Sequence, residues 1–151
     1  MKQKQRRLNL DAYVGKSVFL ASWDTGGEHG FYTEEFVLED FHVQYINDLE
    51  FGVDCIFAEK KEAEDFCSFL RRTVENISSG FKGDKDFHDR EECYSVIFFG
   101  QDGFFSLTKC KFHPVAYNHC IGGMIFRDKK TAEQLCNKLN TSIGLGKEYE
   151  L

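Results

Sequence analysis

Two segments of the chain carry apolar residues at helical spacing. In each, apolar side chains recur at intervals of three and four positions, which places them on one face of an amphipathic helix. The first stripe comprises Ala63, Phe66, Cys67, Leu70 and Val74, and the second comprises Ala132, Leu135, Cys136, Leu139 and Ile143. Asp128 precedes the second stripe and is a suitable N-cap residue. The pattern therefore predicts two helices, each with one buried face.

Shorter segments have the composition of β-strands, with β-branched and aromatic residues between glycine-rich turns. They are Lys16–Trp23, Phe36–Ile46, Gly52–Ala58, Cys93–Phe99, Phe104–Phe112 and Gly122–Arg127. Within Phe36–Ile46 the polar residues Asp40, His42 and Gln44 alternate with apolar ones, which predicts a half-exposed antiparallel strand. Gly100–Gly103 is expected to form a tight hairpin turn.

One strand–helix segment is present twice. Residues Cys55–Leu70 (CIFAEKKEAEDFCSFL) match Met124–Leu139 (MIFRDKKTAEQLCNKL) without a gap, at an offset of 69 residues. A self-match at a fixed offset indicates two copies of one supersecondary unit. We therefore predict an α+β fold in which tandem duplicated β-β-β-α units form one mainly antiparallel sheet, with two helices packed on one face.

The repeat also defines the expected organisation along the chain. A basic N-terminal arm, residues 1–10, precedes a single domain, residues 11–151. The two repeats span about 14–80 and 93–146, and a polar linker, residues 81–92, joins them. The first repeat is expected to have an enlarged hairpin loop, Asp24–Glu35, where the second has its short turn. Loops enlarged on a rigid scaffold commonly carry function.

The two repeats differ in charge. The formal net charge of the chain is −6, to which residues 1–7 contribute +4, residues 8–80 contribute −10 and residues 81–151 contribute zero. Between Lys16 and Lys60 there are ten acidic residues and no Lys or Arg. Such a tract attracts a basic partner and repels nucleic acid, although charge runs also serve as plain solvated surface.

Neither an export signal nor a membrane span is evident in the sequence. The N-terminal residues MKQKQRRLNL have no apolar segment after the basic ones, and the longest apolar runs are far shorter than a bilayer span. We expect a cytoplasmic protein that does not bind membranes. Its six cysteines are then expected to be reduced, with Cys67 and Cys136 as buried structural residues at equivalent positions of the two stripes.

No catalytic or cofactor-binding motif is evident. Cys110, His113, His119 and Cys120 are of the residue types that bind zinc, but their spacing matches no usual zinc knuckle. The polar linker lacks glycine at the sixth position of a calcium-binding loop. Thr25–Gly30 (TGGEHG) is not followed by the Lys-Ser/Thr of a P-loop. We therefore expect neither a cofactor nor an enzymatic activity.

The acidic tract is the feature that best indicates a function. We expect a non-enzymatic binding module whose acidic first repeat engages a basic protein surface. Phage or mobile-element inhibitors of nucleases and other nucleic-acid-handling enzymes are proteins of this type. The residues expected to contact the partner are Asp24, Glu28, Glu34, Glu35, Glu39, Asp40 and His42.

Two alternatives belong to other functional classes. One is a nucleic-acid-binding module that uses Lys2–Arg7 together with Lys109, Lys111 and Phe112. The other is a small metal-dependent enzyme built on His113, His119 and the nearby cysteines. The surface potential distinguishes the first alternative from the binding module, and metal analysis of the purified protein tests the second.

Overall fold

The protein has an α+β fold with antiparallel strands, as predicted. The computed structural model describes residues 8–23, 30–49, 52–114 and 120–144. Its elements are η1 (Leu10–Tyr13), β1 (Ser17–Trp23), β2 (Phe31–Val37), α1 (Asp40–Asn47), β3 (Ile56–Phe57), α2 (Lys60–Ser78), β4 (Glu92–Phe99), β5 (Phe104–Lys111), η3 (Ile121–Gly123) and α3 (Lys129–Ser142).

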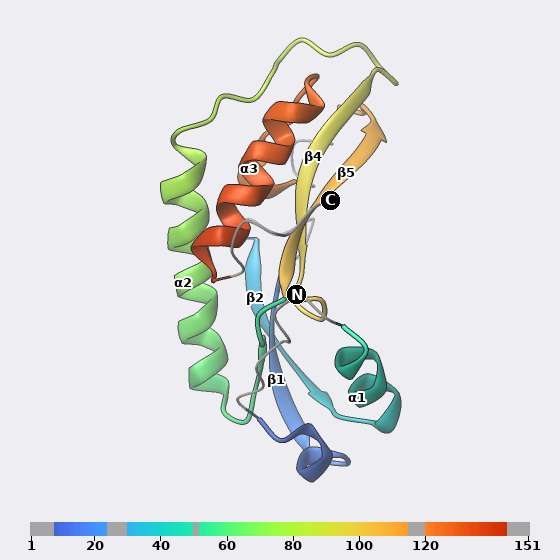
Figure 1. Ribbon diagram of the computed structural model, residues 1–151, viewed down its shortest axis with the longest axis vertical. Coiled ribbons are helices and arrows are strands. Elements are labelled where there is room, and N and C mark those ends of the chain that lie inside the picture. The colour runs from blue at the N-terminus through green and yellow to red at the C-terminus, as the bar shows by residue number, and fades with distance from the viewer. Residues whose placement is uncertain (1–7, 24–29, 50–51, 115–119, 145–151) are drawn as a thin grey trace.

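The described strands form two sheets, not the single sheet expected from the sequence. β1 is the central strand of a three-stranded antiparallel sheet with the order β2-β1-β3, whereas β4 pairs with β5 in a two-stranded antiparallel sheet. Figure 1 shows the two sheets and the helices that accompany them. Phe99 and Phe104 end and begin the strands of the second sheet, so the predicted four-residue turn between them is confirmed.

The two long helices form where the apolar stripes predicted them. α2 packs on β1 and β2, α3 packs on β4 and β5, and the helices lie side by side (Figure 1). Ala63, Cys67 and Leu70 are buried on α2, and the second stripe is buried on α3. The Asp128 carboxylate accepts hydrogen bonds from two backbone amides at the start of α3, as an N-cap does. No helix in the described part of the chain is long and apolar enough to cross a membrane.

The two sheets contribute to one hydrophobic core. Phe31 of β2 meets Phe98 of β4 and Phe105 of β5 edge-on, with ring centroids 5.6 and 6.5 Å apart. All three rings are buried, and the main cluster of buried apolar residues includes members from both halves of the chain. Burial of apolar surface is the dominant stabilising term in folding, so this shared cluster fixes one sheet relative to the other.

The predicted strand Phe36–Ile46 is wrong over most of its length. β2 ends at Val37, and α1 then occupies Asp40–Asn47. Val43 and Ile46, three positions apart, are the buried residues of α1, so the segment buries a helical face. Alternation and helical spacing overlap in so short a segment, and the periodicity alone does not distinguish them.

Two other predicted strands are reduced to short pieces. Of Gly52–Ala58, only the two residues of β3 pair with β1. Gly122–Arg127 begins within η3 and contributes a single antiparallel bridge, between Tyr94 and Phe126. Its first two residues are glycines with φ of +68° and +65°, a left-handed conformation that interrupts an extended strand.

The expected enlarged loop Asp24–Glu35 is shorter than predicted. β2 already begins at Phe31, so Glu34 and Glu35 are strand residues, and positions 24–29 lie outside the described residues.

The polar linker, by contrast, is anchored to the second half. The Arg127 guanidinium donates to the Glu91 carboxylate at 2.6 Å and lies over the Phe87 ring, 4.2 Å from its centroid.

Candidate functional site

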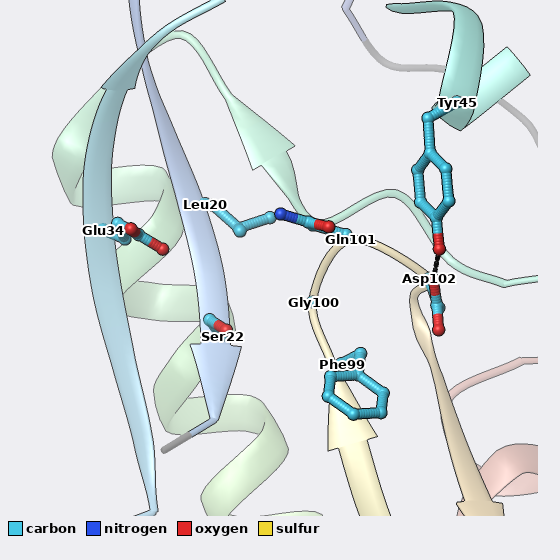
Figure 2. A pocket seen from close by; sticks show the side chains of 8 residues that line it. All are labelled: Leu20, Ser22, Glu34, Tyr45, Phe99, Gly100, Gln101 and Asp102. Carbon is cyan, nitrogen blue, oxygen red and sulfur yellow. Dashed lines mark hydrogen bonds between the residues drawn. The ribbon is translucent and has the colours of Figure 1, made fainter. Parts of the chain in front are cut away.

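A pocket of about 350 Å³ lies between the first sheet and the turn that joins β4 to β5. Segments far apart in the sequence meet there. Its lining residues are Leu20 and Ser22 of β1, Glu34 of β2, Tyr45 of α1, and Phe99, Gly100, Gln101 and Asp102 at the turn (Figure 2).

The pairing of β1 with β2 determines which side chains reach the pocket. Leu20 is opposite Glu34, and Ser22 is opposite Tyr32. Because side chains two positions apart lie on the same face of a strand, Tyr32 is on the pocket side of β2 together with Glu34. The other face is covered by α2, whose Cys67 sulfur lies 3.7 Å from the Thr33 hydroxyl. The pocket is therefore on the face of β2 that α2 leaves uncovered.

A hydrogen bond between α1 and the turn forms one wall of the pocket. The Tyr45 hydroxyl donates to Oδ1 of Asp102, with an oxygen–oxygen distance of 2.5 Å (Figure 2). This bond, together with partial burial and the nearby carboxylate charge, raises the pKa of Tyr45 above its ordinary value of 10.0. Tyr45 is therefore protonated at neutral pH and remains a hydrogen-bond donor to the turn.

Two exposed aromatic side chains line the pocket, and two more belong to the strand and helix that form its walls. They are Tyr32, Phe41, Tyr45 and Phe99, with 42%, 62%, 48% and 52% of their surface exposed, and we call them the aromatic rim. Phe41 and Tyr45 are four positions apart on α1, so they share one side of that helix. Large apolar side chains grouped at the surface are typical of protein interaction sites, where aromatic residues are enriched.

The charge of the pocket is negative. Glu34 and Asp102 contribute carboxylates from opposite sides, and none of the described lining residues is basic (Figure 2). Within the described ranges, no hydrogen bond or ion pair involves the Glu34 side chain. The pocket thus combines carboxylates with aromatic rings, which is an arrangement that attracts a cationic group.

Among the acidic residues predicted to bind a partner, Glu34 is the one that lines this pocket. Glu35 follows it directly but lies on the opposite face of β2, where it is exposed. Asp24 and Glu28 lie outside the described residues. The alternation of the strand thus separates two acids that are neighbours in the sequence.

The remaining predicted residues lie together at the start of α1. Glu39 is the N-cap and Asp40 the first helical residue, a position where negative charge favours the helix. The Glu39 amide donates to Nδ1 of His42 at 2.9 Å, and the His42 ring contacts those of Phe36 and Phe41. His42 therefore has a structural role in beginning the helix.

The sequence did not reveal the other residues of the pocket. The sequence patterns predict apolar strand positions for Tyr45 and Phe99, and a hairpin turn without a further role for Gln101 and Asp102. Their importance depends on the contact between this turn and α1, which no local pattern encodes. The four-residue spacing of Phe41 and Tyr45 was the available signal for one helical side that carries two aromatic rings.

The described residues of zinc-binding type, Cys110, His113 and Cys120, do not form a metal site. His113 lies 3.5 Å from the Asp89 carboxylate, Cys120 is buried, and His119 lies outside the described residues. Burial raises the pKa of Cys120 to about 12, and the nearby Cys110 contributes to the rise. No group of three His, Cys, Asp or Glu side chains suited to a metal ion occurs among the described residues.

Of the residues in the nucleic-acid alternative, the structure describes Lys109 and Lys111 of β5 and the adjacent Phe112. Lys109 lies 3.3 Å from the Glu92 carboxylate, Lys111 is exposed, and residues 2–7 lie outside the described part. The expectation that Phe112 contributes to such a surface is wrong, because its ring is 7% exposed and stacks on Phe87. A buried ring does not stack on a base.

Comparisons with protein-family models, with curated proteins and with solved structures find no match for this chain. The features of the molecule that point to a function are the pocket and the aromatic rim.

Proposed function

We propose that this protein is a non-enzymatic binding module that engages a basic protein surface through the pocket and the aromatic rim. One observation carries the proposal: two carboxylates, with no basic residue among the described lining residues, lie in a pocket bordered by exposed aromatic rings. Aromatic anchors supply contact area in protein interfaces, and complementary charge supplies specificity and fast association.

The same features favour a protein partner over a nucleic acid. Phosphate groups are repelled by carboxylates. Glu34 is exposed on the pocket side of β2, and Glu39 and Asp40 are exposed at the start of α1. A phosphate-binding groove of a nuclease or another nucleic-acid-handling enzyme is a basic surface with the required sign. We propose such an enzyme as the class of target, with this protein as its inhibitor.

We further propose that the fold arose by tandem duplication. Phe57 pairs with Phe19 of β1 shortly before α2, and Phe126, 69 positions later, pairs with Tyr94 of β4 shortly before α3. Corresponding residues of the two copies thus lie beside the first strand of their own sheet. The proposed copies differ after their second strands, β2 and β5, since α1 is present in the first copy alone among the described residues.

A matched pair of charge reversals tests the binding proposal. Glu34→Lys and Glu35→Lys change the net charge equally, at adjacent positions of β2 that face opposite sides. The full-length protein and both variants are immobilised and used to capture proteins from the source cells. We expect a basic protein that is retained by the wild type and by Glu35→Lys, lost with Glu34→Lys, and released by added salt, because salt screens the attraction.

Equal capture by the two variants would show that the pocket is not the binding site. Retention that does not change with salt, or capture of nucleic acid in place of protein, would equally contradict the proposal. Melting temperatures of the variants serve as the control for folding.

A further inference from the structure

Two cysteines lie directly opposite each other on the two strands of the second sheet. The register of β4 and β5 pairs Cys93 with Cys110, and their sulfur atoms are 3.4 Å apart. Directly opposed residues of an antiparallel pair carry their side chains on the same face of the sheet. Both cysteines are thiols in the structure. The pair is therefore positioned for a disulfide bond across the two strands.

The backbone spacing of this pair is compatible with a disulfide. The amide and the carbonyl of Tyr94 are both hydrogen-bonded to Phe126, on the side of β4 that faces away from β5. The direction of hydrogen bonding alternates along an antiparallel strand, so Cys93 and Cys110 form a hydrogen-bonded pair, whose Cα atoms are about 5.5 Å apart. Disulfides join residues with Cα atoms roughly 4.4–6.8 Å apart. The cross-link thus requires rotation of the two side chains and no change in strand pairing.

The two sulfur atoms differ in their access to solvent. Cys93 is fully buried in a small apolar cluster with Phe112, Cys120 and Ile125, whereas Cys110 is half-buried and packs against that cluster. Burial, and then the neighbouring Cys110, raises the pKa of Cys93 to about 12. A thiol that stays protonated is a poor nucleophile towards an oxidant. Cys110 is therefore the sulfur that an oxidant reaches first, and Cys93 is placed to react with the oxidised Cys110.

We propose that Cys93 and Cys110 form a reversible disulfide that links β4 to β5 when the protein meets hydrogen peroxide. The Cys110 sulfur attacks one oxygen of the peroxide, so that an S–O bond forms, the O–O bond breaks, and the thiol proton leaves with the released water. The Cys93 sulfur then displaces the hydroxyl group of the Cys110 sulfenic acid. The S–S bond forms, the S–O bond breaks, and the hydroxyl group leaves as water with the proton of Cys93. Two thiols thus lose two electrons, and one peroxide is reduced to two water molecules.

The geometry of the pair also makes the bond easy to reduce again. Directly opposed Cβ atoms of an antiparallel pair are about 4.5–5.5 Å apart, whereas a disulfide holds them about 3.5–4.5 Å apart. The cross-link therefore strains the two strands, and a strained disulfide is more readily reduced than a relaxed one. Labile disulfides of this kind serve as redox-responsive sites.

The site is separate from the pocket. It lies towards the start of β4 and the end of β5, whereas the turn that lines the pocket joins the other ends of these strands (Figure 1). The proposed disulfide is therefore a second property of the protein, and it does not depend on the proposed function.

Peptide mapping of the full-length protein tests the proposal. The reduced protein is treated with hydrogen peroxide, its remaining thiols are alkylated, and it is digested with trypsin without a reductant. Cys93, Cys110 and Cys120 then lie in three different peptides, because trypsin cleaves after Lys109 and Lys111. We expect the peptides that carry Cys93 and Cys110 to be joined, with a mass lower by two hydrogen atoms than their sum. We also expect reduced glutathione to remove this linked pair completely.

Single serine variants provide matched controls for the mapping. Cys110→Ser is expected to abolish the linkage of Cys93, whereas Cys120→Ser, in the same cluster, is expected to retain the linked pair. The mapping of the wild type needs neither variant to fold. A disulfide to Cys120, oxidation of Cys110 to a sulfinic acid without a disulfide, or no oxidation of either residue overturns the proposal, as does a disulfide that glutathione does not reduce. These outcomes are independent of the capture experiment, so the two proposals fail separately.

Discussion

At the scale of single residues, Asn140 shows how α3 is attached to the second sheet. Its side chain is fully buried, with Oδ1 accepting from the Phe105 amide at 2.8 Å and Nδ2 donating to the Phe105 carbonyl at 3.0 Å. Cys136, one turn earlier, donates its thiol to the same carbonyl. β5 has a strand neighbour on one side among the described residues, and these side chains satisfy backbone groups on its other side.

Replacement of Asn140 by leucine is therefore expected to be costly, although the two side chains have the same branching and the same number of non-hydrogen atoms. The change leaves the Phe105 N–H without a partner in the core and leaves its C=O with the Cys136 thiol alone, so the free energy of unfolding should fall by about 1–3 kcal/mol. Urea denaturation measures this difference. Asn137→Leu, at an exposed position of the same helix, is the control, and equal stability of the two variants would contradict the assigned role.

The cysteines at equivalent stripe positions are buried, free thiols, as predicted. Burial raises the pKa of Cys136 to about 12, and burial likewise raises the pKa of Cys67. A thiol that stays protonated at neutral pH is a poor nucleophile. Both residues therefore have structural roles in the core, consistent with their place in the apolar stripes.

At the scale of elements, the sequence predicted those whose signals are local. The stripes of α2 and α3 extend over several turns, and β1, β4 and β5 are continuous apolar or alternating runs. The pattern does not predict α1, because the helix has only eight residues and because Phe41 and Tyr45, which a strand pattern places on a buried face, are exposed. Its start signal was the acidic pair Glu39 and Asp40, which favours a helix N-terminus.

The residues before β3 could not be predicted for a different reason. Val53 is hydrogen-bonded to Gly103, and Asp54 is buried with Oδ1 accepting from the Ile56 amide. The partner of this segment is thus a turn some fifty positions away in the chain. Apolar composition alone favoured a strand, whereas the tertiary contact determined another conformation.

The N-cap of α3 gives a prediction with a defined pH dependence. Hydrogen bonds from the Thr131 hydroxyl and from the first amides of the helix lower the pKa of Asp128 below its ordinary value of 3.8. A carboxylate whose pKa is lowered by folding stabilises the fold above its ordinary pKa, and this contribution disappears as the pH falls through the folded-state value. Asp128→Ala should therefore lower the melting temperature near neutral pH.

The difference in melting temperature between wild type and Asp128→Ala should narrow as the pH falls below about 4, where the carboxyl begins to protonate in the unfolded state. It should be smallest below the lowered pKa of the folded state, where the carboxyl is protonated in both states. Thermal unfolding across a pH series measures this effect. Glu64→Ala, an exposed change in the second turn of α2, is the control. A difference that stays constant down to acidic pH would show that the cap does not act through its charge.

At the scale of the whole molecule, the pocket is a product of how the two halves meet. Leu20 and Glu34 belong to the first sheet and Asp102 to the turn of the second, with Tyr45 of α1 joining them. The charge asymmetry of the sequence indicated the acidic half but not the turn that completes the site. No sequence pattern relates residue 34 to residue 102. The contribution of the second half to this site therefore follows from the tertiary structure alone.

Gly100 is the residue that allows the turn to approach the first sheet. A Cβ atom at this position would lie 2.2 Å from the carbonyl oxygen of Ala21 in β1, far closer than atoms in contact. Gly100→Ala should therefore push the turn away from β1, weaken the bond between Tyr45 and Asp102, and open the pocket. Overpacking of this kind lowers the free energy of unfolding by about 1–3 kcal/mol.

Gly80→Ala is the matched control, because a Cβ there meets the Ile77 carbonyl at an ordinary 3.6 Å. Urea denaturation and the capture of a basic protein should both distinguish the two variants, with weaker binding for Gly100→Ala alone. Equal stability and equal binding would mean that the turn does not depend on this close contact, and that the pocket forms without it.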